Sequence, residues 1–149
     1  MATPATLRSD RFERLACTHA SAAFVHRIPC PGLAALIDGG DLAHPRLLEL
    51  LAEHCTAMKR LEVDVVVLGC THYSFVRDII ERLLGPGVTV IDTVQAVANQ
   101  VVRLAAPARA TTAVPMSLRV MTSGDAPSVR TVASRWLDVS CQVEAWPSV

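Results

Sequence analysis

Residues 63–73 read VDVVVLGCTHY, a β-branched run that ends in a glycine and continues into polar and aromatic side chains. A short run of this kind, with little alternation of apolar and polar residues, is typical of a strand buried on both faces, here residues 63–69. Residues 73–84 then place apolar side chains at helical spacing, and the sequence GPG at 85–87 ends that helix. A strand that leads directly into a helix is the repeating unit of α/β folds.

The same alternation of strands and helices extends outward in both directions. Pro45 suits the first turn of a helix, and Leu47, Leu51 and Cys55 recur on one face of it. The expected class is therefore α/β, with a parallel sheet flanked by helices. We expect helices over residues 8–18, 32–37, 45–61, 73–84, 93–104 and 127–137, strands over residues 22–28, 63–69, 88–91, 117–122 and 141–145, and a loop over residues 105–115.

The composition excludes several classes of protein. Hydrophobic residues make up 51% of the 149 residues, so the chain has ample material for a core and is not a disordered segment. The 14 basic and 14 acidic residues balance to zero net charge, whereas a general nucleic-acid or acidic-membrane binder carries a basic excess. Aromatic residues are only 4%, too few for base-stacking platforms. We expect no nucleic-acid partner.

The ends and the cysteines indicate a compartment. The first residues show no basic segment followed by an apolar stretch, so we expect no signal peptide. No charge-free apolar run reaches about 18 residues, so no membrane span is expected. The five cysteines are an odd number, which favours free thiols in a reducing compartment. The natural expectation is a cytoplasmic protein.

Residues that can carry chemistry follow the strand at 63–69. Cys70 would stand at the start of a helix, where the positive end of the helix dipole stabilises a thiolate. His72 is close enough to act as a charge partner or proton donor, and Thr71 offers a hydroxyl that can cap the helix or hold a carboxylate. In open α/β sheets, ligands bind outside the carboxyl ends of the strands. The alternatives are a small buried apolar residue at position 70 and a capping or surface histidine at position 72.

The other cysteines suggest packing rather than chemistry. Cys55 falls on the apolar face of its helix, and Cys141 begins the last expected strand. Residues 17–19 repeat the letters CTH of residues 70–72, but no strand precedes them, so we interpret the repeat as coincidence. The one-residue gap in both Cys-x-His pairs is poor spacing for zinc ligands, so no metal is expected.

Four short segments carry recognisable motifs. Residues 3–9 read TPATLRS, residues 30–38 read CPGLAALID, residues 68–75 read LGCTHYSF, and residues 122–125 read TSGD. In this order they resemble the GTxxTxxS, CPxLVPLVE, LGCTHYP and TSGD signatures of the cofactor-independent aspartate/glutamate racemases. The resemblance spans nearly the whole chain, and LGCTHY after a buried strand is its most specific part.

The resemblance implies roles for residues after and before that strand. Family members invert the α-carbon of glutamate with two opposed cysteines and without pyridoxal phosphate, so no cofactor is expected. Cys70 matches one of the two, the thiol that faces L-glutamate. His72 would assist Cys70 in proton transfer, and Asp38, which stands where the family usually has Glu, would support the histidine.

The same resemblance implies a substrate pocket. Thr71, Thr3 and Thr6 match residues that bind the substrate, which is expected to be glutamate, with aspartate as an alternative. Ser74 stands where the family usually has proline, a change that concerns entry into the helix rather than chemistry.

The resemblance also implies a missing part. The family has two similar α/β lobes, and the first lobe carries an Asp-Ser-Gly segment and a Cys-Asn-Thr segment that this sequence does not contain. Residues 1–92 would form the second, catalytic lobe, and residues 93–149 would be a tail that completes the first lobe. We therefore expect the isolated chain to be inactive, and to need the missing lobe or another copy as partner. The alternative is a non-catalytic binding or interaction fragment that keeps the fold.

Overall fold

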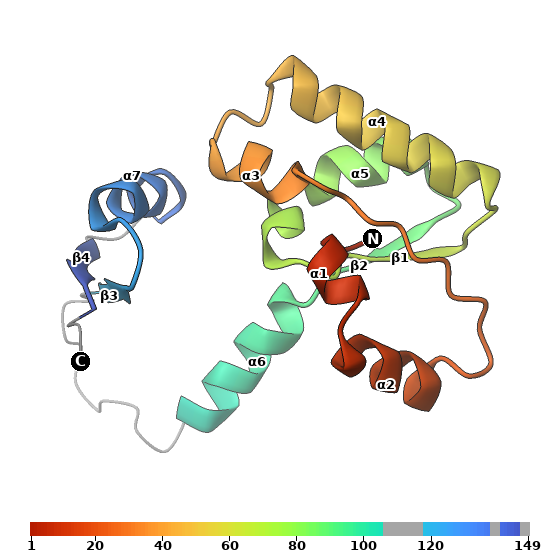
Figure 1. The fold of residues 1–149 in the computed structure, drawn as a ribbon, viewed down its shortest axis with the longest axis horizontal. Coiled ribbons are helices and arrows are strands. Elements are labelled where there is room, and N and C mark those ends of the chain that lie inside the picture. The colour runs from red at the N-terminus through yellow and green to blue at the C-terminus, as the bar shows by residue number, and fades with distance from the viewer. Residues whose placement is uncertain (106–117, 138–140, 147–149) are drawn as a thin grey trace. The chain divides into compact units, whose positions relative to one another are not determined.

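A computed structural model describes residues 1–105, 118–137 and 141–146, and in it helices alternate with parallel strands (Figure 1). The chain divides into two compact units, Met1–Arg103 and Leu104–Val149, which we describe separately. The helices are α1 (Pro4–Leu7), α2 (Asp10–His19), α3 (Leu33–Asp38), α4 (Pro45–Arg60), the 3₁₀ helix η1 (Thr71–Val76), α5 (Arg77–Leu84), α6 (Val94–Ala105) and α7 (Ala126–Trp136). The strands are β1 (Val65–Val67), β2 (Thr89–Ile91), β3 (Leu118–Thr122) and β4 (Cys141–Ala145).

The sheet of the first unit is parallel, as predicted. β1 pairs with β2 in a register that places Val66 opposite Val90. On the other side of β1, the segment Met1–Ala2 continues the parallel pattern: the Met1 amine donates to Val67 O at 2.9 Å, and Gly69 N–H donates to Met1 O at 2.9 Å. β1 therefore lies between two neighbours.

A fourth segment, residues 28–30, pairs with Met1–Ala2. Ala2 N–H donates to Ile28 O at 3.1 Å, and Cys30 N–H donates to Ala2 O at 3.0 Å. The order across the unit is therefore β2, β1, residues 1–2 and residues 28–30, all running in the same direction. The carboxyl ends of all four segments meet at one edge of the sheet.

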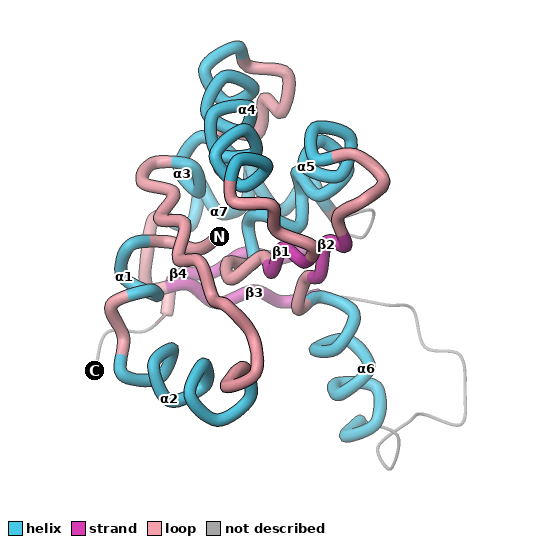
Figure 2. Tube along the Cα trace, turned by 90° about the vertical axis from the view of Figure 1, so that its right-hand side faces the viewer, coloured by secondary structure: helices cyan, strands magenta, loops and turns pink. Residues whose placement is uncertain are grey.

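The core lies between the sheet and the pair α4 and α5, which cover one face, while α2 lies on the side of the opposite face (Figures 1 and 2). α4 begins with Pro45 in its first turn, as expected from the sequence. The residues of its predicted apolar face are buried together with Val66 and Val90 from the strands. These core residues of α4 are Leu47, Leu51, Cys55 and Met58.

The expectation that residues 63–69 are buried on both faces is wrong. Val66 is buried, but Val65 and Val67 are 44% and 52% exposed, and Ile91 on the neighbouring strand is exposed as well. Successive side chains of a strand point to opposite faces, and only the face toward α4 and α5 is covered. The regular strand is also shorter than expected, because Val65–Val67 alone pairs along its length with β2.

Two further predictions need correction. Residues 22–28 were expected to form a strand, but they lie in turns and loop, and Phe24 is 99% exposed. Pairing begins only around Pro29, which forms an isolated bridge with Ala2, and proline has no N–H with which to extend the ladder. The helix expected over residues 73–84 is two elements, η1 and α5, because the backbone of Val76 leaves helical geometry at φ −113°.

The second unit contains β3 and β4 as a parallel pair, with α7 between them in sequence. α7 begins at the TSGD segment, where the Asp125 carboxylate accepts from Ser128 N–H at 2.9 Å. Arg130 on α7 donates to Val143 O at 3.0 Å, and the Val143 side chain is buried. Residues 106–117, including most of the loop expected at 105–115 and Ser117, lie outside the described residues.

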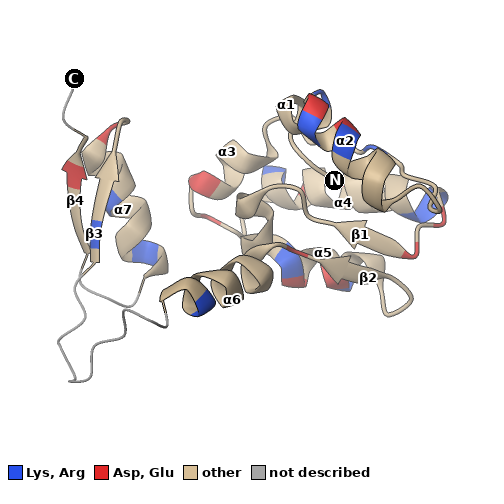
Figure 3. Cartoon of the chain, turned by 90° about the horizontal axis from the view of Figure 1, so that it is seen from below, with Lys and Arg blue, Asp and Glu red and all other residues tan. Residues whose placement is uncertain are grey.

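α6 differs from the other long helices of the first unit, because all twelve of its residues are exposed. Figure 3 shows it as an almost uncharged helix, and its apolar side chains Val94, Val97, Val101 and Leu104 are half-exposed or more. A surface helix of a globular protein normally buries its apolar side chains, so α6 leaves uncovered a face that such helices cover. The two units divide after Arg103, near the end of this helix, and the assignment of residues 93–149 to another lobe stays a prediction.

The α4 core provides a test of the packing. Leu51→Ala should lower the free energy of unfolding by about 2–5 kcal/mol, because Leu51 is fully buried and its truncation leaves a cavity. Leu48→Ala, on the same helix but 38% exposed, should change it by less than about 1 kcal/mol. Urea titrations of the two variants measure the difference, and equal losses would contradict this placement of α4.

Candidate active site

The candidate residues gather where the central segments of the sheet end. Cys70 follows β1 by three residues, and Thr3 directly follows the paired segment Met1–Ala2. These two chain segments touch closely at Gly69, where an added Cβ would lie 2.9 Å from the Ala2 Cβ. Glycine suits this position because a side chain would overlap the Ala2 methyl group and crowd Met1 O at 3.3 Å.

A chain of three side chains connects Cys70 to the surface. Cys70 Sγ lies 3.6 Å from His72 Nδ1, and His72 Nε2 lies 3.0 Å from Asp38 Oδ1. A neutral imidazole that donates from Nε2 to Asp38 leaves Nδ1 free to accept a proton from the thiol. The structure thus brings together the three residues predicted from the sequence, in an order suited to acid–base chemistry.

The position of Asp38 depends on a short helix that is anchored in the core. α3 begins after Gly32, whose φ of 76° is readily adopted only by glycine, and ends with Asp38. Leu33 and Ile37 on the same helix are buried, so they fix its position against the core. Although Asp38 is shorter than the glutamate usual in the family motif, its carboxylate reaches His72.

The three threonines lie at the same edge, and two of them contact each other. Thr3 precedes α1 and accepts from Thr6 N–H at 3.2 Å, and the two hydroxyl oxygens are 2.9 Å apart. Thr3 is therefore the N-cap of α1, and the Thr6 hydroxyl contacts the capping oxygen. Thr71 is the exposed first residue of η1, directly after Cys70. The substrate-binding roles of Thr71, Thr3 and Thr6 stay predictions.

Sequence reasoning placed Tyr73 on an apolar helix face but gave it no role at the site. Tyr73 is fully buried, and its hydroxyl donates to Cys30 O at 3.4 Å. The bond ties the segment after β1 to the segment after residue 28, two loops that are 43 residues apart in sequence. The signal in the sequence that could have indicated this role is a tyrosine, which has a polar hydroxyl, on an otherwise apolar helix face.

The remaining thiols differ from Cys70 in their surroundings. Cys30 and Cys55 are buried, and burial raises the pKa of each to about 11, so both stay protonated near neutral pH. Cys55 lies in the core as predicted, Cys141 begins β4, and Cys17 is exposed on α2. Within residues 1–105, 118–137 and 141–146, no group of three His, Cys, Asp or Glu side chains is placed to hold a metal ion. Over the same residues, none of the helices has the length and apolar character needed to span a bilayer.

Comparison with known families agrees with the parallel α/β fold. The model of the Asp/Glu/hydantoin racemase family matches residues 1–101, which is more than half of the chain. The chain therefore belongs to the Asp/Glu/hydantoin racemase family.

Two relatives of the chain are glutamate racemases. The glutamate racemase of Pseudomonas syringae pv. tomato is 42% identical over 104 residues, which are 70% of this chain and 38% of that protein. The glutamate racemase of Herpetosiphon aurantiacus is 41% identical over 108 residues, 72% of this chain and 42% of that protein. The chain thus spans about 40% of the length of these curated relatives.

Solved structures share the fold. A glutamate racemase isoform, RacE1, from Bacillus anthracis matches with a TM-score of 0.81 and 24% identity, over 98% of this chain and 55% of that chain. The Escherichia coli glutamate racemase, in complex with L-glutamate and the activator UDP-MurNAc-Ala, matches with a TM-score of 0.75 and 19% identity, over 99% and 57% of the two chains. These likenesses confirm the α/β fold.

The close approach at Gly69 can be tested with a pair of glycine variants. Gly69→Ala should lower the free energy of unfolding by about 1–3 kcal/mol, because the new methyl group would overlap Ala2. Gly87→Ala, where an added Cβ meets nothing within 4 Å, is the matched control and should be close to neutral. Thermal unfolding of both variants decides, and a neutral Gly69→Ala would show that Ala2 does not pack there.

The buried thiols predict how stability changes with pH. Unfolded thiols lose their protons near pH 9, whereas Cys30 and Cys55 hold theirs until about pH 11 in the folded chain. The folded state therefore binds more protons between these values, and the free energy of unfolding should fall as the pH rises above 9. The expected slope is about 1.4 kcal/mol per pH unit for each thiol.

Urea titrations between pH 8 and pH 10 measure this slope. Cys55→Ala should be less stable at every pH, because it loses packing, but its stability should fall less steeply than that of the parent chain. Comparison with the parent removes the contribution of the other groups that titrate in this range. An identical slope in the two proteins would contradict the assignment of a buried, protonated thiol at position 55.

Proposed function

We propose that the chain is the part of a glutamate racemase that carries one of its two acid–base thiols, and that Cys70 is this thiol. The relay from Cys70 through His72 to Asp38 carries the proposal, since it supplies a thiol with an adjacent proton acceptor at a ligand-binding edge. The matches to glutamate racemases from several bacteria support glutamate as the substrate.

The proposed reaction is a proton exchange at one carbon atom. The Cys70 thiolate takes the α-proton of L-glutamate, so that the C–H bond breaks, an S–H bond forms and the electron pair stays on the α-carbon. A thiol on the opposite face of the substrate then delivers a different proton to that carbon, which gives D-glutamate. His72 holds or returns the proton of Cys70, and Asp38 orients the imidazole so that Nδ1 faces the sulfur.

The threonines supply the groups that would hold the substrate. Glutamate presents two carboxylates and an ammonium group, and hydroxyls can donate to the former and accept from the latter. Thr71 lies beside Cys70 in sequence, and Thr3 and Thr6 lie on the segment that touches Gly69. The proposal therefore draws the substrate hydroxyls from two places in the fold, the start of η1 and the segment Thr3–Thr6.

A single thiol cannot invert the α-carbon, because removal and delivery occur on opposite faces. The second acid belongs to the other lobe, which would also exclude water from the cleft. This lobe is either joined to the chain in a longer protein or supplied by a separate partner, and association with another copy of the chain is the alternative. The proposed role is supply of D-glutamate for peptidoglycan in the cytoplasm.

Reconstitution from separate parts tests the proposal. The chain alone should leave L-glutamate unchanged, whereas a mixture with the separately produced first lobe of the Pseudomonas syringae relative should racemise it. Circular dichroism follows the loss of optical activity, and deuterium uptake at the α-carbon in D₂O reports the proton exchange. Aspartate in place of glutamate distinguishes the two substrates.

Two cysteine variants make the test specific. Cys70→Ala should reduce the rate of the mixture by about 10²–10⁴-fold, because it removes the acid–base group. Cys17→Ala, which removes an exposed thiol on α2, is the control and should leave the rate unchanged. A complex that forms but shows no activity, or activity that survives Cys70→Ala, would refute the proposed role of Cys70.

A further inference from the structure

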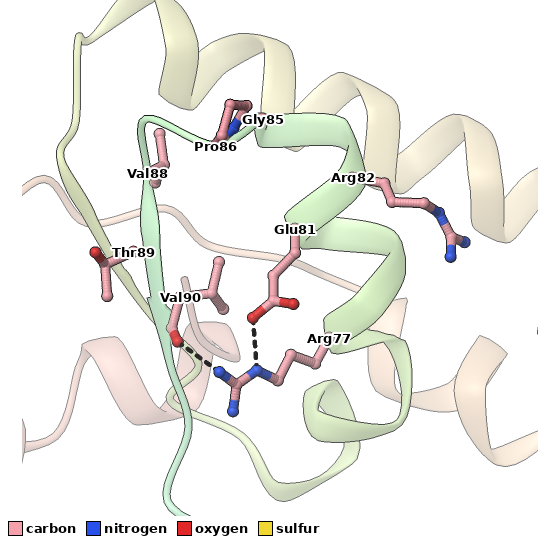
Figure 4. A pocket seen from close by; sticks show the side chains of 8 residues that line it. All are labelled: Arg77, Glu81, Arg82, Gly85, Pro86, Val88, Thr89 and Val90. Atoms are coloured by element: carbon pink, nitrogen blue, oxygen red, sulfur yellow. Dashed lines mark hydrogen bonds and ion pairs between the residues drawn. The ribbon is translucent and has the colours of Figure 1, made fainter.

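Arg77 connects the first turn of α5 to the place where β2 leads into α6. Its guanidinium donates from Nη2 to Val90 O at 3.1 Å and from Nη1 to Asp92 Oδ2 at 3.4 Å. Its Nε donates to Glu81 Oε1 at 2.8 Å, one turn further along α5. Figure 4 shows the guanidinium between Glu81 and the backbone of Val90, at the side of a pocket of about 510 Å³.

Asp92 is the residue at which this arrangement meets α6. Its side chain is only 9% exposed, so its carboxylate needs a charged or hydrogen-bonding partner. One oxygen faces Arg77, and the other accepts from Val94 N–H at 3.2 Å, at the first residue of α6. Asp92 is therefore bonded both to the Arg77 guanidinium and to the first N–H of α6.

The backbone of Arg77 belongs to the candidate site as well. Its N–H donates to Ser74 O and so closes η1, the 3₁₀ helix that follows Cys70 and contains His72. Arg77 therefore contacts η1 through its backbone, and the end of β2 through its side chain.

We propose that Arg77 is a positioning residue that fixes the start of α6 relative to β2 and holds the loop bearing Cys70 and His72 in the same arrangement. Its rigid fork of N–H groups reaches three acceptors at once, in α5, in β2 and at the residue that follows β2. α6 needs such fixation, because a fully exposed helix of twelve residues is marginal by itself. The role of Arg77 at α6 does not depend on the proposed function; only its consequence for Cys70 bears on that function.

Amide hydrogen exchange of the full chain tests the start of α6. In Arg77→Met, the first amides of α6, including that of Val97, which donates to Thr93 O, should exchange about tenfold faster. Arg77→Lys should restore part of the protection, because an ammonium can reach one acceptor but cannot replace the fork. Arg82→Met, on the same helix and at the same pocket, is the matched control and should leave the exchange of α6 unchanged.

A variant cycle separates this role from a general loss of stability. In an Asp92→Asn background, Arg77→Met should accelerate exchange at α6 by less than about twofold. The carboxylate at position 92 that pairs with the guanidinium is already absent there. Ile80→Val removes a buried methylene of α5 without touching the ion pair, so it should lower overall stability and leave α6 no faster than the rest of the unit. Equal effects of Arg77→Met with and without the aspartate, or equal effects of Arg77→Met and Arg82→Met, would overturn the proposal.

Thiol labelling tests the connection to the site. Arg77→Met keeps the backbone bond to Ser74 O but loses the side-chain bonds that anchor this residue, so η1 should be held less firmly. Alkylation of Cys70 should then become several-fold faster relative to the exposed Cys17, whereas Arg82→Met should leave this ratio unchanged. An unchanged ratio in Arg77→Met would refute the link to the loop. Because both measurements use the chain without substrate, they stand apart from the reconstitution of racemase activity.

Discussion

The contact between Ala2 and Gly69 is the constraint on which the arrangement of the site depends. Parallel pairing alone would place residues 1–2 beside β1, but only a residue without a side chain at position 69 lets the two backbones approach closely. Thr3 and Cys70 then leave the sheet side by side. Since residues 28–30 pair with Ala2 on its other side, the segment that leads to Asp38 leaves the same edge. A close contact between two segments of the sheet thus helps to bring Cys70, His72 and Asp38 to one edge.

The same fold gives chemically identical cysteines different properties. Cys30 and Cys55 are surrounded by the core, where the neutral thiol is favoured. Cys70 lies at the rim, half-buried, with an imidazole beside its sulfur. Tyr73 joins the two environments, because it is buried next to Cys30 and follows Cys70 by three residues. The position in the fold, rather than the residue type, therefore separates the two core thiols from the partly exposed thiol beside His72.

Much of the first unit could be predicted because its signals are local. The run at 63–69, the proline at the start of α4 and the glycine after α5 each act within a few residues. The motif at 68–75 pointed to Cys70 and His72, whose side chains lie together, and their catalytic roles stay predictions. The errors concern which segments pair as strands and which faces of the sheet are covered by helices, and both depend on residues far apart in sequence. For example, the apolar run at 22–28 predicts a strand, but its sequence does not reveal that pairing with Ala2 forms only around Pro29. The bond of Arg77 to Asp92 crosses 15 residues of sequence and leaves no periodic trace.

The exposed valines of β1 and α6 make the behaviour of the chain sensitive to its solvent. Apolar surface of this kind gains from burial against any complementary surface. Sulfate and other strongly hydrated salts are excluded from protein surfaces and strengthen that gain, while urea weakens it. Strongly hydrated salts therefore favour, and urea disfavours, the burial of exposed residues such as Val65, Val67 and Val101, none of which belongs to the group of Cys70, His72 and Asp38.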